Sequence, residues 1–120
     1  SAPQMTVDRE RLGRLRDMAD MVLDARTQTM RQANEARAAL QRQLDALEVK
    51  PAPEGLPWPA PEQARFGYEQ WAAVRRAEIN LRLSAQTVIC LQAAEETRLA
   101  FGRQMALKSV AVPKRRDQLS

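Results

Sequence analysis

Five of the seven prolines of this 120-residue chain lie in one short segment, Val49 to Pro61, which reads VKPAPEGLPWPAP. Proline removes a backbone hydrogen-bond donor and holds the preceding residue extended, so a helix cannot continue through such a run. By contrast, residues 6–48 and 62–112 contain no proline. The sequence therefore predicts two helical arms, the second beginning at Pro61, that are joined by a turn at 49–60.

The first arm, 6–48, carries one apolar stripe. At about 100° per residue, ten residues fall on one helix face in the steps of three and four that are typical of paired helices: Leu12, Leu15, Ala19, Val22, Leu23, Met30, Ala33, Leu40, Leu44 and Leu47. Thr6 is the predicted N-cap, because acidic residues follow it in the first turn. A helix of about 40 residues, roughly 60 Å long, needs a partner along its length to be stable.

The second arm, 61–112, carries a matching stripe. Proline is tolerated at the first helical position, and Pro113 is expected to stop the helix near Val112. The predicted seam residues are Ala72, Ile79, Leu83, Gln86, Cys90, Ala93, Thr97, Ala100, Gln104 and Leu107. Residues 113–120 then form a short basic tail. Alanine in the seam lets two helices approach closely but buries little area per layer.

The turn is too short to return along the length of an arm, so arms that pair within one chain must run antiparallel. We therefore expect an all-α fold, with residues 1–120 forming a single long two-helix antiparallel coiled-coil hairpin with a proline-rich turn. If the arms meet at the turn, the numbers of facing residues add to about 109. That register places Val22 near Thr87 and Leu12 near Thr97.

The second arm also carries a second apolar line, which the first arm lacks. Val74, Leu81, Val88, Leu99 and Val110 recur about 180° from the seam. Single apolar residues are common on protein surfaces, but five at one azimuth also suit contact with another chain. Exposed surface and partner contact are therefore both open interpretations, and the second makes these residues candidates for partner binding.

Three aromatic residues lie near the turn. Trp58 stands between two prolines and outside both stripes, so it either folds back over Leu47 and Tyr68 or stands out to bind a partner. Tyr68 and Trp71 lie one helical turn apart, and we expect them to cap the end of the hairpin core. Cys90, in the seam, is expected to be a buried small hydrophobe rather than a reactive thiol.

Arg26 and Arg37 lie beside the seam of the first arm. One interpretation is that their aliphatic stems cover apolar surface while the charged heads reach water. The other is that they pair with acids of the second arm such as Glu69 or Glu78, which would help to set the register.

The composition argues against catalysis and against a bound metal or cofactor. The chain has no histidine and one cysteine, so the commonest zinc ligands and the commonest catalytic base are missing. The adjacent acids Glu95 and Glu96 point about 100° apart on a helix and do not converge on a substrate. We expect no enzymatic activity, no cofactor and no small-molecule substrate.

The net charge of +4 is dispersed along the chain rather than concentrated. Residues 6–48 carry eight arginines and eight acids, and residues 61–112 carry seven basic and five acidic groups. Nucleic-acid sites concentrate basic residues in a stripe, so this interleaving disfavours such a site. No apolar run approaches the about 20 residues of a membrane span, and no signal-peptide pattern is present, so we expect a cytoplasmic protein.

Three segments carry a resemblance to a known family: RLGRLRDMADMVLDAR (Arg11 to Arg26), RQANEARAALQRQLDALE (Arg31 to Glu48) and RLAFGRQMAL (Arg98 to Leu107). In these arginine- and alanine-rich arms the chain resembles the FliJ family of flagellar export proteins and their counterparts in type III secretion. The resemblance implies a cytoplasmic stalk, peripheral to a membrane export apparatus, that inserts in an ATPase ring. Such a stalk couples the ring to the export gate and escorts chaperones.

Other classes of function fit the same two arms. One is a generic coiled-coil adaptor or secretion chaperone that binds a partner helix along Val74, Leu81 and Val88. A homodimer would use the same line. The other is a nucleic-acid-binding helical hairpin, which the balanced charge disfavours and which a salt titration of binding would identify.

Overall fold

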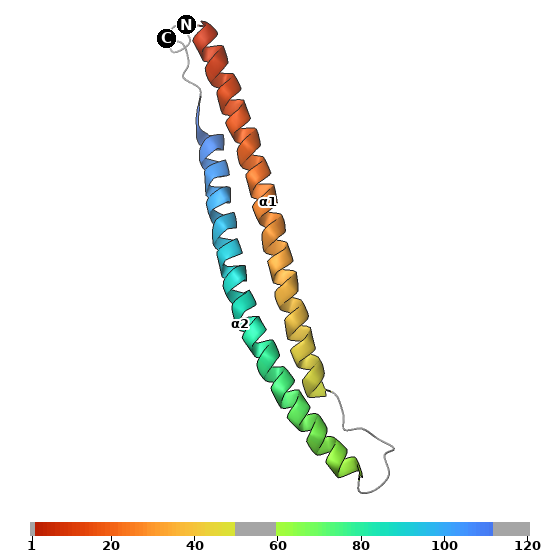
Figure 1. Cartoon of the computed structure of the whole chain (residues 1–120). Helices are drawn as coiled ribbons and strands as arrows, with labels where there is room; N and C mark the ends of the chain where they lie inside the picture. Colours follow the sequence, from red (N-terminus) through yellow and green to blue (C-terminus); the bar gives the residue numbers. More distant parts are fainter. Residues whose placement is uncertain (1, 50–59, 112–120) are drawn as a thin grey trace. The chain divides into compact units, whose positions relative to one another are not determined.

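The computed structural model describes residues 2–49 and 60–111, which form two helices (Figure 1). Helix α1 spans Ala2–Val49 and helix α2 spans Ala60–Ser109. Within the described ranges only Val110 and Ala111 lie outside a helix, and no residue is in a strand. The predicted all-α class is confirmed. The proline-rich turn and the basic tail lie outside the described residues.

Three of the four helix ends fall where proline and its neighbours allow them. Helix α1 ends one residue beyond the predicted Glu48, and α2 begins at Ala60 with Pro61 directly after it. The predicted N-cap was wrong, because α1 already begins at Ala2 and the Thr6 hydroxyl donates to the carbonyl of Ala2 at 3.1 Å. Pro3 is compatible with this earlier start, since the first helical N–H groups have no intrahelical acceptor.

The fourth helix end depends on a side chain from the other helix. Helix α2 ends at Ser109, three residues before the predicted Val112. The guanidinium of Arg16 donates to the carbonyl oxygens of Leu107 at 2.9 Å, Lys108 at 3.5 Å and Val110 at 2.7 Å. A helix leaves its last carbonyls without intrahelical donors, and a cation is favoured there. Arg16 therefore caps the carboxyl end of α2.

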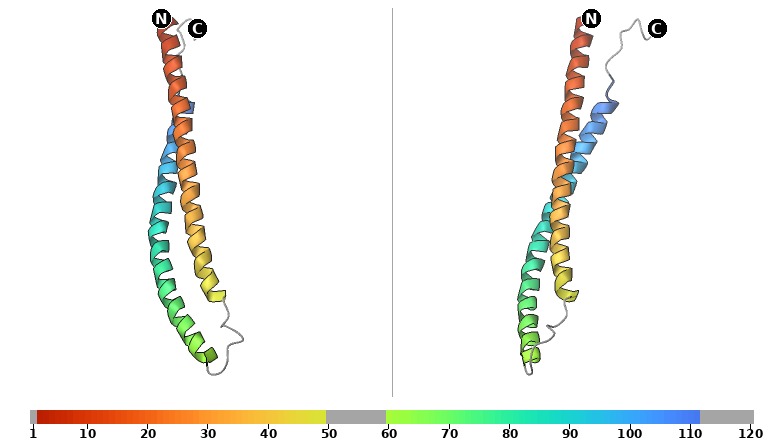
Figure 2. Two further views of the ribbon diagram at one scale, coloured as in Figure 1. Left: turned by 45° about the vertical axis from the view of Figure 1, so that its right-hand side comes forward. Right: turned by 90° about the vertical axis from the view of Figure 1, so that its right-hand side faces the viewer.

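The chain divides into two compact units, and each contains a segment of both helices. We call Ser1–Arg31 with Gln92–Ser120 the terminal unit, and Gln32–Leu91 the central unit. In each unit the α1 segment and the α2 segment lie side by side and run in opposite directions, as the further views in Figure 2 also show. The predicted antiparallel pairing is thus present in each unit.

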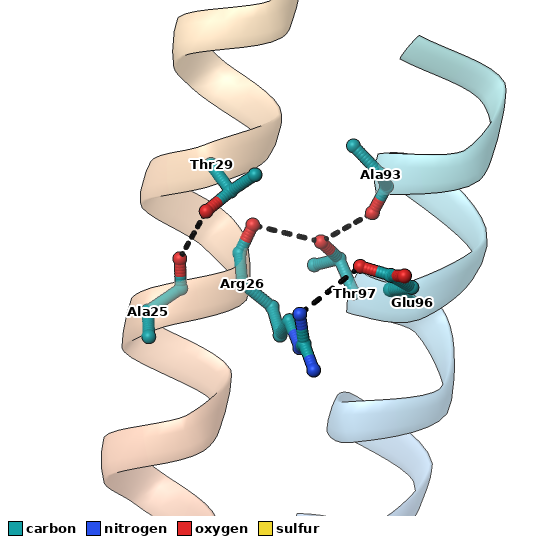
Figure 3. A network of polar contacts seen from close by, with 6 residues as sticks. All are labelled: Ala25, Arg26, Thr29, Ala93, Glu96 and Thr97. Atoms are coloured by element: carbon teal, nitrogen blue, oxygen red, sulfur yellow. Dashed lines mark hydrogen bonds and ion pairs between the residues drawn. The ribbon is translucent and has the colours of Figure 1, made fainter. Parts of the chain in front are cut away.

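In the terminal unit, the seam between the helices combines small apolar residues with polar pairs. Leu12, Ala93 and Ala100 are buried. Figure 3 shows one polar layer, in which the Thr97 hydroxyl lies 3.1 Å from the carbonyl of Arg26 and 2.8 Å from that of Ala93. The same Arg26 donates to the Glu96 carboxylate at 3.1 Å. Arg26 therefore forms an ion pair across the seam, with a different acid from the two that the sequence had suggested.

A second polar layer of the terminal unit joins Gln104 and Asp20. The amide of Gln104 donates to the Asp20 carboxylate at 2.7 Å, and both side chains are half-buried. A hydrogen bond to a charged group is shorter and stronger than a neutral one. This layer thus gives the seam a specific contact where the flanking apolar residues are small.

In the central unit the seam is more apolar. Ala33, Ala72 and Ile79 are buried, and Ile79 is only 1% exposed. The amide of Gln86 and the thiol of Cys90 both donate to the carbonyl of Ala33, at 3.0 and 3.2 Å. Cys90 is half-buried, as its predicted place in the seam requires. Four leucines of the predicted seam are half-buried in this unit: Leu40, Leu44, Leu47 and Leu83.

The predicted faces are largely confirmed. All ten seam residues predicted for α2 are buried or half-buried, and so are eight of the ten predicted for α1. The two exceptions are Leu15 and Val22, which are 49% and 42% exposed. Arg16 and Asp20 occupy the seam beside them instead, because each finds a polar partner on α2.

The predicted register was wrong. The numbers of contacting residues add to 123 or 124, not to about 109, in the pairs Arg16–Leu107, Asp20–Gln104, Ala33–Cys90 and Arg37–Thr87. The difference of about two heptads returns each helix to the same face, so the apolar pattern cannot reveal it. The polar residues can: the predicted register would place Arg26 opposite Leu83, whereas the observed one gives it Thr97 and Glu96.

Candidate interaction surface on the outer face of helix α2

The predicted second line of α2 is exposed in the central unit. The exposed fractions are 61% for Val74, 75% for Leu81 and 53% for Val88. These residues recur every seven positions, so they keep one azimuth in a helix that pairs with a heptad rhythm. That azimuth lies opposite the seam residues Ile79 and Gln86, which face α1. The apolar line therefore points away from the helix pair.

The line extends beyond the residues that the sequence singled out. Leu91 is 66% exposed, and the small residues Ala77 and Ser84 between the larger ones are exposed too. Together they form what we call the outer seam, with steps of three and four throughout: Val74, Ala77, Leu81, Ser84, Val88 and Leu91. Because Ala77 and Ser84 are small, the spacing of the large apolar residues alone does not reveal the steps of three and four.

The second half of the outer seam lies in an uncharged stretch of α2, whereas Arg75, Arg76, Glu78 and Arg82 accompany its first half. Residues 83–94 of α2 contain no charged side chain, although most of them are exposed. Exposed helix surfaces normally alternate charges of both signs, and interfaces are depleted in charge at their core. The hydroxyl of Ser84 donates to the carbonyl of Asn80 at 3.0 Å, so it is satisfied within its own helix. Over residues 83–94 the surface of α2 thus lacks the charged groups that usually keep a helix surface in water.

The structure does not place the other three candidates for partner contact in the outer seam. Leu99 is 46% exposed but belongs to the terminal unit, so it is not part of the outer seam. Val110 is 48% exposed and follows the last residue of α2, so it is not on the helical line at all. Trp58 lies outside the described residues.

The aromatic pair behaves only partly as predicted. Tyr68 is half-buried, and its ring centroid lies 5.7 Å from that of Trp71 in a tilted contact. Trp71 itself is 54% exposed, so it does not cap the core. Tyr68 instead borders a hollow of about 550 Å³ between the end of α1 and the start of α2, which is lined by Leu47, Glu48, Arg65, Tyr68, Glu69, Ala72 and Arg76. The hollow has mixed charges, without a concentration of acids or bases.

A smaller groove lies in the terminal unit. It measures about 160 Å³ and is lined by Leu15, Met18, Ala19, Val22, Ala100, Arg103 and Leu107. It is where Leu15 and Val22, which the sequence assigned to the seam, meet the edge of α2. The groove interrupts the polar surface of this unit with a narrow apolar strip.

The ion pairs of the described residues lie at the surface. Besides Arg26–Glu96, they are Arg42–Glu35, Arg75–Glu78 and Arg98–Glu95, at 2.8, 3.2 and 2.6 Å. The hydrogen bond from Arg98 lowers the pKa of Glu95 below its ordinary value. Glu95 thus turns toward its own helix and Glu96 toward Arg26, so the two acids do not converge. Exposed pairs of this kind add little stability.

The described residues hold neither a metal-binding cluster nor a helix suited to span a membrane. They contain no group of three or more histidine, cysteine, aspartate or glutamate residues placed to hold a metal ion. Neither α1 nor α2, over its described length, combines the length and the apolar character that crossing a bilayer requires.

Comparison with known proteins adds no relative. No family model, no curated protein and no solved structure matches this chain.

Proposed function

We propose that this chain is a non-catalytic helical protein-interaction module that docks a partner helix on the outer seam of α2. The observation that carries the proposal is the coincidence of two features on one face. The large residues of the outer seam are more than half exposed, and residues 83–94 beside them are uncharged. An apolar line with steps of three and four is the pattern by which one helix packs on another.

The arginine- and alanine-rich arms support a more specific form of the proposal. In them the chain resembles the stalk and escort proteins of flagellar and type III secretion export. We propose that it serves a cytoplasmic export apparatus in this way, with the ring of an export ATPase as its partner. In the central unit the pairing with α1 leaves the outer seam of α2 open, which suits contact with a surrounding ring.

The test is a double substitution in the outer seam. Leu81→Glu with Val88→Glu should leave the helices folded, because both side chains are exposed and face away from α1. The same change should reduce capture of a purified export-ATPase ring subunit at least tenfold, since an unpaired carboxylate is costly in an apolar contact. Circular dichroism checks the folding, and a quantitative pull-down checks the capture.

The matched control places the same two negative charges on α1. Gln28 and Gln32 are exposed, so Gln28→Glu with Gln32→Glu should neither unfold the chain nor weaken capture. Loss of helix in the outer-seam variant would assign Leu81 and Val88 to the core. Equal capture by all three proteins would contradict the proposal.

The adaptor and nucleic-acid alternatives separate in simple binding experiments. A generic adaptor or secretion chaperone would use the outer seam on a different protein, so the double variant would lose that protein and the ATPase subunit would never bind. A nucleic-acid-binding hairpin would lose affinity steeply with salt, because bound phosphates release counterions. Contact through the outer seam depends weakly on salt, since residues 83–94 carry no charge.

A further inference from the structure

The side chains of the outer seam are complementary in size to those of a second, antiparallel copy. From Val74 to Val88 the large and small residues of the seam alternate in an order that an antiparallel second copy would match, and the two large residues Val74 and Leu91 form the layers at its ends. Val74, Leu81 and Val88 hold one set of positions, and Ala77, Ser84 and Leu91 hold the other. In an antiparallel helix pair, residues of one set face residues of the other set. The outer seam lies wholly within the central unit, so this argument uses only that unit.

We propose that the outer seam is a homodimer interface, in which α2 packs antiparallel on α2 of a second copy about a two-fold axis between Arg82 and Leu83. This inference rests on the proposed function, and it names a partner for the same face. The facing layers are Val74 with Leu91, Ala77 with Val88, and Leu81 with Ser84, each formed twice.

The alternation of sizes selects this arrangement. In the antiparallel register, Leu81 faces a serine and Val88 faces an alanine, so each of these layers combines one large and one small side chain. A parallel pair would instead set Leu81 against Leu81 and Ala77 against Ala77. A layer of two leucines needs a larger distance between the helices than a layer of two alanines. At any one distance some layers would leave gaps, and their side chains would lose dispersion contacts.

The flanks of the outer seam allow two copies to approach. On one side lie Ala73, Asn80 and Thr87, which are uncharged, and the one charged group of the described residues that bonds to them is the Arg37 guanidinium of α1, which donates to the Thr87 hydroxyl at 3.1 Å. On the other, Glu78 is the only charged side chain among the positions next to the seam, and it would face Ala85 of the second copy rather than another acid. Glu78 is already paired with Arg75 of its own helix at 3.2 Å. No like-charge contact therefore opposes the dimer.

The length of the outer seam determines the affinity that we expect for the homodimer. One helix-to-helix contact of about five turns is smaller than a standard interface, so the association belongs to the weak or transient class. It should appear at protomer concentrations from micromolar to millimolar. At low concentration the outer seam would be open to another helix of similar character.

Cysteine cross-linking tests the register directly. In a Cys90→Ser background, Ala77→Cys and Val88→Cys proteins are prepared separately and then mixed under copper–phenanthroline oxidation. The mixture should form disulfide-linked dimers between the two variants, and each variant alone should form few. Positions 77 of the two copies would lie about 16 Å apart in this register, which is beyond the reach of a disulfide. Gln28→Cys, on the exposed side of α1, measures random collision.

Sedimentation equilibrium supplies the second measurement. The unmodified chain should show a reversible monomer–dimer equilibrium, which Leu81→Glu abolishes and Gln28→Glu leaves unchanged. A chain that stays monomeric at millimolar concentration overturns the proposal. So does cross-linking of each variant with itself but not across the mixture, which would indicate a parallel pair. If the chain is monomeric but the Leu81→Glu, Val88→Glu variant still loses the ATPase subunit, the proposed function stands and only the homodimer fails.

Discussion

The central unit and the terminal unit use the same heptad rhythm with different residues. In the central unit the seam holds Ile79 at 1% exposure among half-buried leucines. In the described part of the terminal unit the largest buried side chain is Leu12, and polar contacts of Arg16, Asp20 and Arg26 alternate with alanines. The central unit thus relies more on apolar burial, although hydrogen bonds of Gln86, Cys90 and Arg37 also cross its seam, and the terminal unit relies more on polar contacts.

The apolar and the polar layers contribute differently to the stability of the helix pairs and to the register of the two helices. Apolar layers contribute most of the free energy of packing, but they are similar from one heptad to the next. Polar layers contribute less, yet each charged side chain needs a particular partner to avoid facing an apolar surface. The central unit should therefore contribute more of the free energy of unfolding, while the polar layers, most of them in the terminal unit, fix which residues face each other.

The largest predicted effect is in the seam of the central unit. Ile79→Ala should lower the free energy of unfolding by about 2–4 kcal/mol, because it removes buried methyl groups and leaves a cavity. Urea unfolding followed by helical dichroism measures it. Ile89→Ala is the matched control, since Ile89 is 47% exposed on the same helix and should cost well under half as much. Similar costs at the two sites would contradict the assignment of faces.

In the terminal unit we expect a smaller and more local effect. Arg16→Ala should cost about 1 kcal/mol, because the carbonyls at the end of α2 lose their donor to water. The amides of the last turn of α2 should exchange faster with deuterium, while those near Ile79 should not change. Arg14→Ala, at an exposed neighbouring position, serves as the control. If both arginine variants exchange alike, Arg16 is not a cap.

A third prediction should affect the two units equally. Gly67 and Gly102 lie within α2, one in each unit, and an added Cβ would meet nothing within 4 Å at either position. Gly67→Ala and Gly102→Ala should each raise the free energy of unfolding by roughly 0.5–1 kcal/mol, through helix propensity alone. Unequal gains would show that the two units do not unfold as one cooperative structure.

The smallest effect concerns the surface of the terminal unit. Arg98→Ala should return the pKa of Glu95 upward to its ordinary value and leave the melting temperature unchanged. Because the folded-state pKa is lowered, any stabilisation from this pair is present at neutral pH and is lost as pH falls through that pKa. A carboxylate titration followed by NMR checks the shift. A pKa of Glu95 that does not move would mean that Arg98 is not its cause.

The helices and their faces could be predicted from the sequence, because proline placement and apolar periodicity are local signals. The register could not, because the predicted alignment assumed that the helices pair right up to the turn. The observed pairs, such as Ala33 with Cys90, give a register displaced by about two heptads, which repeats the apolar pattern. Asking which acids and amides could face Arg26 and Asp20 would have found the observed register.

The candidate surface was predictable in part. Val74, Leu81 and Val88 were found from their spacing, since large apolar residues at one azimuth are conspicuous. Leu91 was missed because it belongs to the set of positions that Ala77 and Ser84 otherwise hold, and large apolar residues alone do not show that set. The exposed side of Trp71 was also missed, because proximity to the turn does not reveal whether an aromatic ring packs inward.

The Arg16 contact has a consequence for the order in which the chain folds. Most of α2 is held by hydrogen bonds between residues four apart, which form quickly and without help from the rest of the chain. Arg16 and Leu107 are separated by 91 residues, so their contact forms only after a long loop has closed. We expect the last turn of α2 to be among the latest parts to become ordered, and an isolated α2 peptide to fray at that end.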